Sequence, residues 1–278
     1  MTHPLVTTDW LAEHLEDPNL VLVDTSWHMP AAARDGRAEY LASHLPGAVF
    51  FGIDEIADKT NTLPHMLPSP EDFAAAVGRL GIADTDAIVV YDEAGIFSAP
   101  RVWWTFRTMG AEDVRVLDGG GPKWRAEARP TEAGAVMRAA KTFVPHFQTA
   151  LVQDFDSVLG LTQSRSKTII DARPGERFRG EAPEPRAGLA SGHIPGSLNV
   201  PAGTVSLDGQ MKPASELATL FREAGVDVTK PIVTSCGSGI TASTVALALA
   251  LAGARDVSVY DGSWTEWGGR ADAPVATG

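Results

Sequence analysis

Short apolar runs alternate with longer segments of mixed apolar and polar residues along this chain. A short apolar run bounded by turn residues predicts a buried strand, whereas apolar positions three or four residues apart predict an amphipathic helix. In the first half these patterns place strands at 5–6, 19–24, 49–51, 87–92 and 114–117, and helices at 8–15, 70–80 and 100–109. Alternating strands and helices are typical of an α/β domain with a mainly parallel sheet. The polar segment around Arg34 to Tyr40 is expected to be a loop.

The second half of the chain repeats the order of the first. Ser43-His44-Leu45-Pro46-Gly47 is matched by Gly192-His193-Ile194-Pro195-Gly196, and each turn leads into an apolar run. Trp124 is matched by Trp267 near the end of each copy. The other matched pairs are 5–9 with 151–155, 21–25 with 168–172, and 114–119 with 257–262. Because the register drifts by only a few residues, the pattern predicts a tandem repeat.

Two domains follow from this repeat, and a length of 278 residues suits two domains. The stretch around Pro130 and Gly134 is rich in alanine and has the composition of a linker. We therefore place a first domain at 1–128, a linker at 129–147 and a second domain at 148–278.

Composition and charge exclude several classes of protein. Hydrophobic residues make up 44% and charged residues 21%, which is ordinary for a globular protein. A net charge of -12 without a long basic stretch argues against a nucleic-acid partner or an anionic membrane surface. The N-terminus has no signal-peptide pattern, and no apolar run reaches the roughly 18 residues of a membrane span. A single cysteine cannot form an intramolecular disulfide, so we expect a cytoplasmic protein.

That cysteine opens the segment with the clearest chemistry, Cys236-Gly237-Ser238-Gly239-Ile240-Thr241. An apolar run at 231–234 precedes it and a run of small and apolar residues at 241–251 follows, which predicts a strand, a tight loop and a buried helix. Glycines let such a loop turn its backbone N–H groups inward, and a helix N-terminus favours negative charge. A lone cysteine is often only a small buried residue, but this setting favours a reactive thiolate.

The two copies differ at this position. Aligning the strands at 87–91 and 231–235 puts Asp92 opposite Cys236. Only the second copy can therefore carry out nucleophilic chemistry, and the first copy would act as scaffold and as a wall of the cleft.

The tandem repeat, the paired His-Leu-Pro-Gly and His-Ile-Pro-Gly turns and the single loop cysteine resemble the two-domain rhodanese sulfurtransferases. The resemblance covers nearly the whole chain and implies two rhodanese-like α/β domains, each a mainly parallel sheet flanked by helices. The loop starting at Cys236 is similar to that of the 3-mercaptopyruvate sulfurtransferase branch. Thiosulfate-using members carry cationic side chains just after the cysteine, where this chain has Gly237 and Ser238. The segment Asp261–Trp267 also resembles the C-terminal signature of the family.

The resemblance implies catalytic residues outside the cysteine. In this branch a serine two residues after the cysteine works with a histidine and an aspartate from the first domain, which match Ser238, His65 and Asp54. Read without the family, Ser238 could cap the following helix, His65 could be a surface histidine and Asp54 a turn acid.

The resemblance also implies substrate-binding residues. Two arginines would bind the donor, and they match Arg177 and Arg186, with Arg179 as a further contact. The loop residues Gly237, Gly239, Ile240 and Thr241 would line the same site. The alternative is that the arginines belong to a solvated charged loop, since several glutamates lie beside them.

The implied reaction moves sulfur from 3-mercaptopyruvate through a Cys236 persulfide to an acceptor and releases pyruvate. The acceptor would be a thiol such as thioredoxin or a small dithiol, or cyanide. No metal and no organic cofactor are expected, since Cys236 has no second thiol beside it for a thiolate metal site.

Three other functions match the residues less well. A thiosulfate:cyanide sulfurtransferase is the nearest enzyme, and the absence of cations at 237 and 238 argues against it. A non-catalytic rhodanese-like binding or sulfur-carrier module would not need the full set of implied residues. A cysteine-loop phosphatase needs an arginine six residues after the cysteine, where this chain has Ala242.

Overall fold

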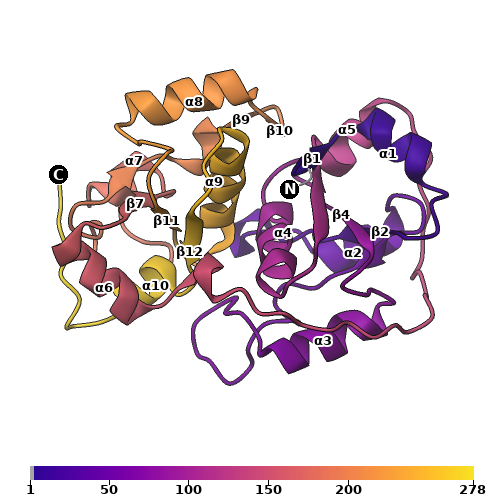
Figure 1. The fold of residues 1–278 in the computed structure, drawn as a ribbon, viewed down its shortest axis with the longest axis horizontal. Helices are drawn as coiled ribbons and strands as arrows, with labels where there is room; N and C mark the ends of the chain where they lie inside the picture. Colours follow the sequence, from indigo (N-terminus) through magenta and orange to yellow (C-terminus); the bar gives the residue numbers. More distant parts are fainter. Residues whose placement is uncertain (1–2) are drawn as a thin grey trace. The chain divides into compact units, whose positions relative to one another are not determined.

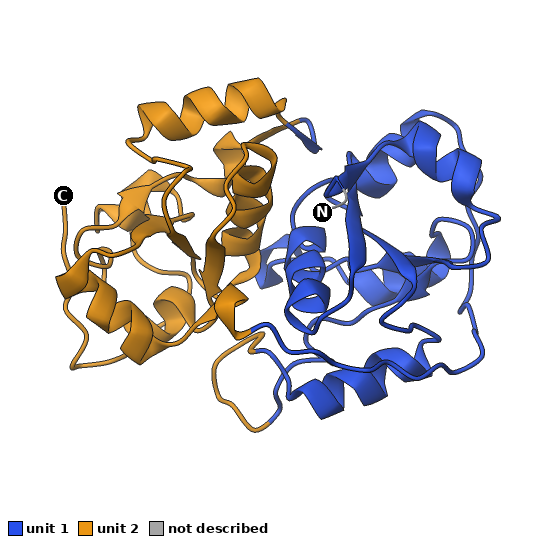
Figure 2. Cartoon of the chain, viewed as in Figure 1, with its two compact units in different colours: residues 1–59, 67–148, 208–211 blue, residues 60–66, 149–207, 212–278 orange. Residues whose placement is uncertain are grey.

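The computed structural model describes residues 3–278, which form two compact units (Figure 2). Unit 1 contains the residues up to Lys59 together with Leu67–Gln148 and Asp208–Met211. Unit 2 contains Thr60–Met66, Thr149–Leu207 and Lys212–Gly278. Each unit has its own parallel sheet and its own core, and each is described by itself.

The sheet of unit 1 has five strands, and helices follow or separate them along the sequence (Figure 1). The strands are β1 (Leu5–Val6), β2 (Leu20–Asp24), β3 (Val49–Phe50), β4 (Ala87–Tyr91) and β5 (Asp113–Leu117). The helices are α1 (Thr8–His14), α2 (Gly36–Ala42), α3 (Pro70–Arg79), α4 (Ala99–Thr108) and α5 (Gly120–Ala126), with a short 3-10 helix, η1 (Pro30–Ala32).

Unit 2 repeats this plan with a second five-stranded sheet. The strands are β6 (Val152–Gln153), β7 (Thr168–Asp171), β8 (Leu198–Asn199), β11 (Ile232–Ser235) and β12 (Val257–Tyr260). The helices are α6 (Phe155–Ser164), α7 (Gly175–Phe178), α8 (Ala214–Glu223), α9 (Ile240–Leu251) and α10 (Ser263–Trp267). Unit 2 also contains the short elements η2 (Thr149–Leu151), η3 (Ala202–Thr204) and β9 (Ser206–Leu207), whereas β10 (Gln210–Met211) belongs to unit 1.

Strand order and register show that the two sheets are copies of one design. The orders are β1-β5-β4-β2-β3 and β6-β12-β11-β7-β8, and the neighbouring strands in each are parallel. On the central strands, Asp24 lies opposite Tyr91 in one sheet and Asp171 lies opposite Ser235 in the other. This confirms the predicted α/β fold with two parallel sheets, and Asp92 and Cys236 follow equivalent strand ends.

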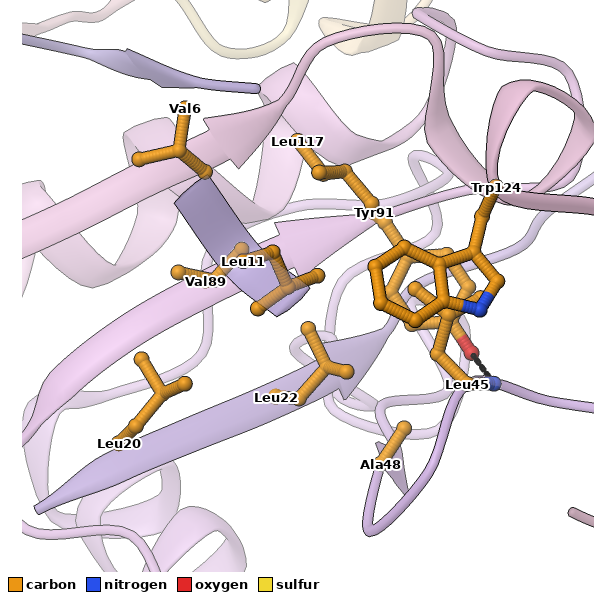
Figure 3. Packing of buried hydrophobic residues seen from close by; sticks show 10 residues of the cluster. All are labelled: Val6, Leu11, Leu20, Leu22, Leu45, Ala48, Val89, Tyr91, Leu117 and Trp124. Carbon is orange, nitrogen blue, oxygen red and sulfur yellow. Dashed lines mark hydrogen bonds between the residues drawn. The ribbon is translucent and has the colours of Figure 1, made fainter. Parts of the chain in front are cut away.

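Each unit buries its own apolar core, as the uninterrupted apolar strands predicted. In unit 1, side chains from β1, β2, β4 and β5 form one buried cluster with Trp124, and the backbone N–H of Leu45 donates to the Tyr91 hydroxyl at 3.1 Å (Figure 3). In unit 2, Trp264 and Trp267 pack with Phe155 and Tyr260. The matched tryptophans make the same contact, since the Nε1 atoms of Trp124 and Trp267 donate to a proline carbonyl at 2.7 and 2.8 Å.

The stretch predicted as a linker, residues 129–147, lies within unit 1. Its Glu132 pairs through the backbone with His44, in the way that Ala276 pairs with His193 in unit 2. In each copy of the repeat, the histidine of the turn is thus hydrogen-bonded through its backbone to the segment at the end of that copy. The backbone hydrogen bonds of this segment give it a fixed path, which alanine-rich composition did not reveal.

The segment expected to be a loop around Arg34 to Tyr40 contains the helix α2, so that prediction was wrong. Asp35 caps this helix by accepting from the backbone N–H of Ala38 at 3.1 Å. Tyr40 is buried and its hydroxyl donates to the carbonyl of Ala48 at 2.9 Å. The charged residues of this segment obscured the helical pattern, because Tyr40 is the residue of α2 that is buried.

The loop after β4 folds around the side chain of Asp92. One carboxylate oxygen accepts from the backbone N–H of Ala94, and the other accepts from those of Phe97, Ser98 and Ala99, all at 2.8 Å. The Asp92 side chain is therefore the anion of a cradle made of backbone N–H groups.

We expect Asp92→Ala to destabilise the protein by about 3 kcal/mol, because it leaves several buried N–H groups without their charged acceptor. Asp92→Asn, which keeps one carbonyl oxygen, should lose less. Urea denaturation measures both losses. Added sulfate should stabilise Asp92→Ala more than the wild type, whose cradle already holds a carboxylate and which gains only the general stabilisation by an excluded salt. An alanine variant as stable as the wild type would contradict this account of the loop.

Asp24 at the end of β2 and its counterpart Asp171 at the end of β7 are both buried, but they have different hydrogen-bond partners. Burial raises the pKa of Asp24 to about 6, since it penalises the charged form more than hydrogen bonds from Ser26 stabilise it. Its counterpart Asp171 instead accepts three hydrogen bonds from the guanidinium of Arg173, at 2.6 to 3.1 Å. Position 26, which matches position 173, holds a serine in unit 1, so this carboxyl lacks the adjacent arginine.

Because the folded-state pKa of Asp24 lies above its unfolded value, the stability linked to its protonation is present below about pH 4 and is lost as pH rises through 6. We expect Asp24→Asn to be more stable than the wild type at pH 7.5, by up to about 3 kcal/mol, with the difference closing near pH 4. Denaturation across pH tests this. The matched variant Asp171→Asn should instead destabilise the protein at pH 7.5, because it removes a buried ion pair.

Candidate active site

Cys236 lies where the central strand β11 ends and the chain turns into α9. Its side chain is buried and forms no disulfide. Gly239 ends the loop with a φ of 81°, a left-handed conformation that favours glycine, and α9 begins at the next residue. The predicted strand, loop and helix are all present, and the loop is shorter than that of unit 1, where the helix begins only at Ala99.

The loop backbone of unit 2 has the same polarity as the Asp92 cradle. Within residues 3–278, the N–H groups of Gly237, Ser238, Gly239, Ile240 and Thr241 donate to no acceptor. They include the first N–H groups of α9, where the helix dipole favours an anion. In unit 1 the equivalent cradle holds a carboxylate, so the loop of unit 2 can stabilise negative charge carried by sulfur on Cys236.

Hydrogen bonds from α10 fix the start of the loop. The N–H of Cys236 donates to the hydroxyl of Ser263 at 3.2 Å, and its carbonyl accepts from the N–H of Trp264 at 2.9 Å. The carbonyl of Gly237 accepts from the N–H and hydroxyl of Thr265, at 2.9 and 2.7 Å. Ser263 has a φ of 50°, and the equivalent residue of unit 1 is a glycine with a similar φ. This backbone conformation is costly for a serine, and it places the serine hydroxyl where it accepts from the N–H of Cys236.

Two of the predicted arginines meet at the loop. A Cβ atom added to Gly237 would lie 3.6 Å from Nη2 of Arg177 and 3.9 Å from Nη1 of Arg186. Arg186 is half-buried and makes no ion pair with any residue in the range 3–278. Arg179 points elsewhere and forms an exposed pair with Glu181 at 2.7 Å. The loop therefore faces two cationic forks of the kind that bind carboxylates.

A chain of buried ion pairs supports the first of these arginines. Arg177 is paired with Glu184, whose other contact is Arg173 at 2.7 Å, and Arg173 is paired with Asp171. The side chain of Glu184 is 2% exposed and that of Arg173 is 1% exposed. The guanidinium of Arg173 also stacks on the ring of Trp264, 4.1 Å from its centroid. This segment is therefore not a solvated charged loop.

The remaining predicted residues are placed as follows. Ser238 is buried in the loop, and its hydroxyl has no hydrogen-bond partner among residues 3–278. His65 is buried, has a φ of 63°, and belongs to the segment Thr60–Met66 that is grouped with unit 2 rather than with the first half of the chain. Asp54 is in unit 1, is exposed, and accepts from the indole N–H of Trp27 at 2.7 Å.

Sequence reasoning missed Arg173, Glu184 and Ser263 as parts of this site. Arg173 and Glu184 are charged residues in a charged stretch, and only burial distinguishes them from surface residues. A signal existed for Ser263, because it lies within the recognised segment Asp261–Trp267.

The described residues contain neither a candidate metal site nor a membrane-spanning helix. In the range 3–278 there is no group of three or more histidine, cysteine, aspartate or glutamate side chains that could hold a metal ion. No helix in that range combines the length and apolarity needed to span a membrane.

Comparison with known proteins identifies the repeat. The family model described as a rhodanese-like domain matches residues 7–127 and 155–270. A 3-mercaptopyruvate sulfurtransferase of Escherichia coli (strain K12) is 46% identical over 271 residues, covering 97% of this chain and 96% of the relative. A thiosulfate sulfurtransferase of Gallus gallus is 41% identical over 274 residues, covering 96% and 94%.

Solved structures agree with these matches. The crystal structure of SseA from Escherichia coli, which concerns 3-mercaptopyruvate sulfotransferases, superposes with a TM-score of 0.87 at 44% identity. The match covers 95% of this chain and 99% of SseA. The matches cover both halves of the sequence and nearly the full length of these relatives. The chain therefore belongs to the rhodanese-like family as a tandem two-domain sulfurtransferase.

Proposed function

We propose that this chain transfers the sulfur of 3-mercaptopyruvate to a thiol acceptor and releases pyruvate. The observation that carries the proposal is the loop at Cys236, where the thiol is buried, the N–H groups of Gly237 to Thr241 donate to no acceptor within residues 3–278, and Arg177 and Arg186 lie close to Gly237. A sulfur nucleophile, an anion cradle and two guanidinium groups suit a small donor that has both a thiol and a carboxylate. The similarity to relatives named for this activity supports the same donor.

The first step forms a persulfide. Arg177 and Arg186 hold the carboxylate and keto oxygens of the donor, which fixes its thiol sulfur near Cys236. The Cys236 thiolate attacks that sulfur and forms the S–S bond, while the C–S bond breaks and its electrons leave on the pyruvate enolate. A proton added to the enolate carbon gives pyruvate. The loop N–H groups stabilise the anionic outer sulfur of the persulfide.

We assign the proton transfer of this step to Ser238 with His65 and Asp54. The Ser238 hydroxyl is buried in the loop, so it can move or polarise a proton at the reacting sulfur. His65 is held buried in a left-handed backbone conformation that costs a non-glycine residue about 1 kcal/mol, and strain of this kind clusters at functional sites. We include Asp54 as the carboxylate of a hydroxyl–imidazole–carboxylate set of the kind used in acyl transfer, on the resemblance to the family.

The second step regenerates the free thiolate of Cys236. An acceptor thiol attacks the outer sulfur of the persulfide, an acceptor persulfide forms, and the Cys236 thiolate leaves. A second thiol on the same acceptor can then displace that sulfur as hydrosulfide and close a disulfide. We propose a dithiol, either small or of the thioredoxin type, as the acceptor, with cyanide as a substitute that yields thiocyanate. We further propose that the protein works in the cytoplasm, where free thiols are maintained.

Thiosulfate is the second candidate donor, because relatives of similar identity are named for it. This chain has Gly237 and Ser238 after the cysteine, so the loop adds no cationic side chain for a dianion. We therefore propose thiosulfate as a side substrate.

Cys236→Ser should abolish pyruvate release from 3-mercaptopyruvate, because a serine hydroxyl cannot form the persulfide. Mass spectrometry of the wild type after donor treatment should show a gain of about 32 Da, one sulfur atom, that reducing agent removes. The serine variant should show no gain. Pyruvate release at an unchanged rate in Cys236→Ser would exclude the mechanism.

Ser238→Ala should lower kcat for 3-mercaptopyruvate by about 10²-fold, the usual contribution of a positioned proton-transfer group. Thiocyanate formation from thiosulfate and cyanide should fall much less, because sulfite leaves without needing that proton. Both reactions are measured on the same preparations. Equal losses with the two donors would leave Ser238 as a residue that only shapes the loop.

A further inference from the structure

Two arginines at the loop do not by themselves explain a preference for 3-mercaptopyruvate. This inference rests on the proposed function and concerns its donor selectivity. The carboxylate of 3-mercaptopyruvate carries one negative charge, whereas thiosulfate carries two. Arg177 and Arg186 acting alone would give a pocket with two positive charges, which would suit the dianion better.

The carboxylate of Glu184 changes this balance. Its Oε1 accepts from Nε of Arg177 at 3.2 Å, and its Oε2 accepts from Nη2 of the same arginine. Nη2 is also the atom that lies 3.6 Å from the position of an added Cβ on Gly237. Glu184 therefore holds the Nε and Nη2 atoms of Arg177, and Nη2 is also the atom of that arginine nearest to the loop.

The charges of the buried chain cancel. Asp171 and Glu184 contribute two negative charges, Arg173 and Arg177 contribute two positive charges, and successive members are in contact. Arg186 is the group that keeps an uncompensated charge, since it pairs with no residue in the described range 3–278. Because Glu184 is only 2% exposed, water screens its field weakly, and an anion at the loop experiences it.

We propose that Glu184 is the specificity-determining residue of this site. It reduces the charge of the anion pocket from two to one and aligns Arg177, so that the pocket favours a monoanionic carboxylate donor over dianionic thiosulfate. It acts through Arg177 and touches no reacting atom, so its role is one of positioning and charge.

The test is Glu184→Gln, which keeps the size and one oxygen acceptor of the side chain but removes its charge. We expect kcat/KM for thiosulfate to rise relative to that for 3-mercaptopyruvate by about tenfold, mainly through a lower KM for thiosulfate. If Glu184 had a purely structural role, kcat/KM would fall by similar factors for both donors. That result, or an unchanged ratio of the two kcat/KM values, would overturn the proposal.

Glu181→Gln is the matched control. It removes the same charge from the same segment, but Glu181 is 58% exposed and pairs with Arg179 at the surface. The donor ratio should not change in this variant. A shift equal to that of Glu184→Gln would show that overall charge, rather than the buried carboxylate, decides the preference, and would also overturn the proposal.

Glu184→Asp covers the case in which the glutamine variant does not fold, as judged by circular dichroism. It keeps the charge on a shorter side chain, so both donors should lose activity by similar factors. A shift of Glu184→Asp toward thiosulfate would overturn the proposal. If the wild type releases no pyruvate from 3-mercaptopyruvate, the proposed function fails. Measurements with thiosulfate still test the role of the Glu184 charge, because the KM for thiosulfate must fall in Glu184→Gln. An unchanged KM for thiosulfate would refute that role.

Discussion

Stabilisation of an anion by backbone N–H groups is the interaction around which both copies of this fold are arranged. At the end of each central strand the chain turns so that several N–H groups point inward. In unit 1 the carboxylate of Asp92 accepts four of them. In unit 2 a cysteine takes the place of the aspartate, and the loop N–H groups remain available to a sulfur anion. One design thus gives a self-satisfied loop in one copy and a reactive loop in the other.

The same divergence extends to the residues behind the loops. Asp24 and Asp171 occupy equivalent strand ends, but only Asp171 has an arginine two residues later. In unit 2 this arginine starts a chain of ion pairs that ends at Arg177, beside Gly237. Buried ion pairs contribute little net stability, and the chain is better understood as a way to hold one guanidinium in a fixed direction at a site that must bind an anion.

Several features of the site could be derived from the sequence because they are local. The apolar strand before Cys236, the glycines of the loop and the small apolar residues after it predicted the strand, the loop and the buried helix α9. The repeat could be read because matched turns and tryptophans recur in order. The roles of Ser238, His65 and Asp54 came only from resemblance to a family, since no spacing along the chain links these three residues.

The sequence by itself determined the α/β class and the tandem repeat, because strand and helix periods and the order of motifs are properties of the chain. It also singled out one cysteine as a candidate nucleophile, and the resemblance to a family added two arginines as candidate substrate-binding residues. Only the tertiary structure decided which charges are buried. It moved Glu184 from a presumed solvated loop to a contact with Arg173 and Arg177, and it grouped Thr60–Met66, with His65, with unit 2. It also gave Tyr40 the buried position that anchors α2. Burial and ion pairing depend on contacts between residues far apart in sequence. The sequence alone therefore does not show whether a charged or polar side chain is surrounded by water or by other side chains.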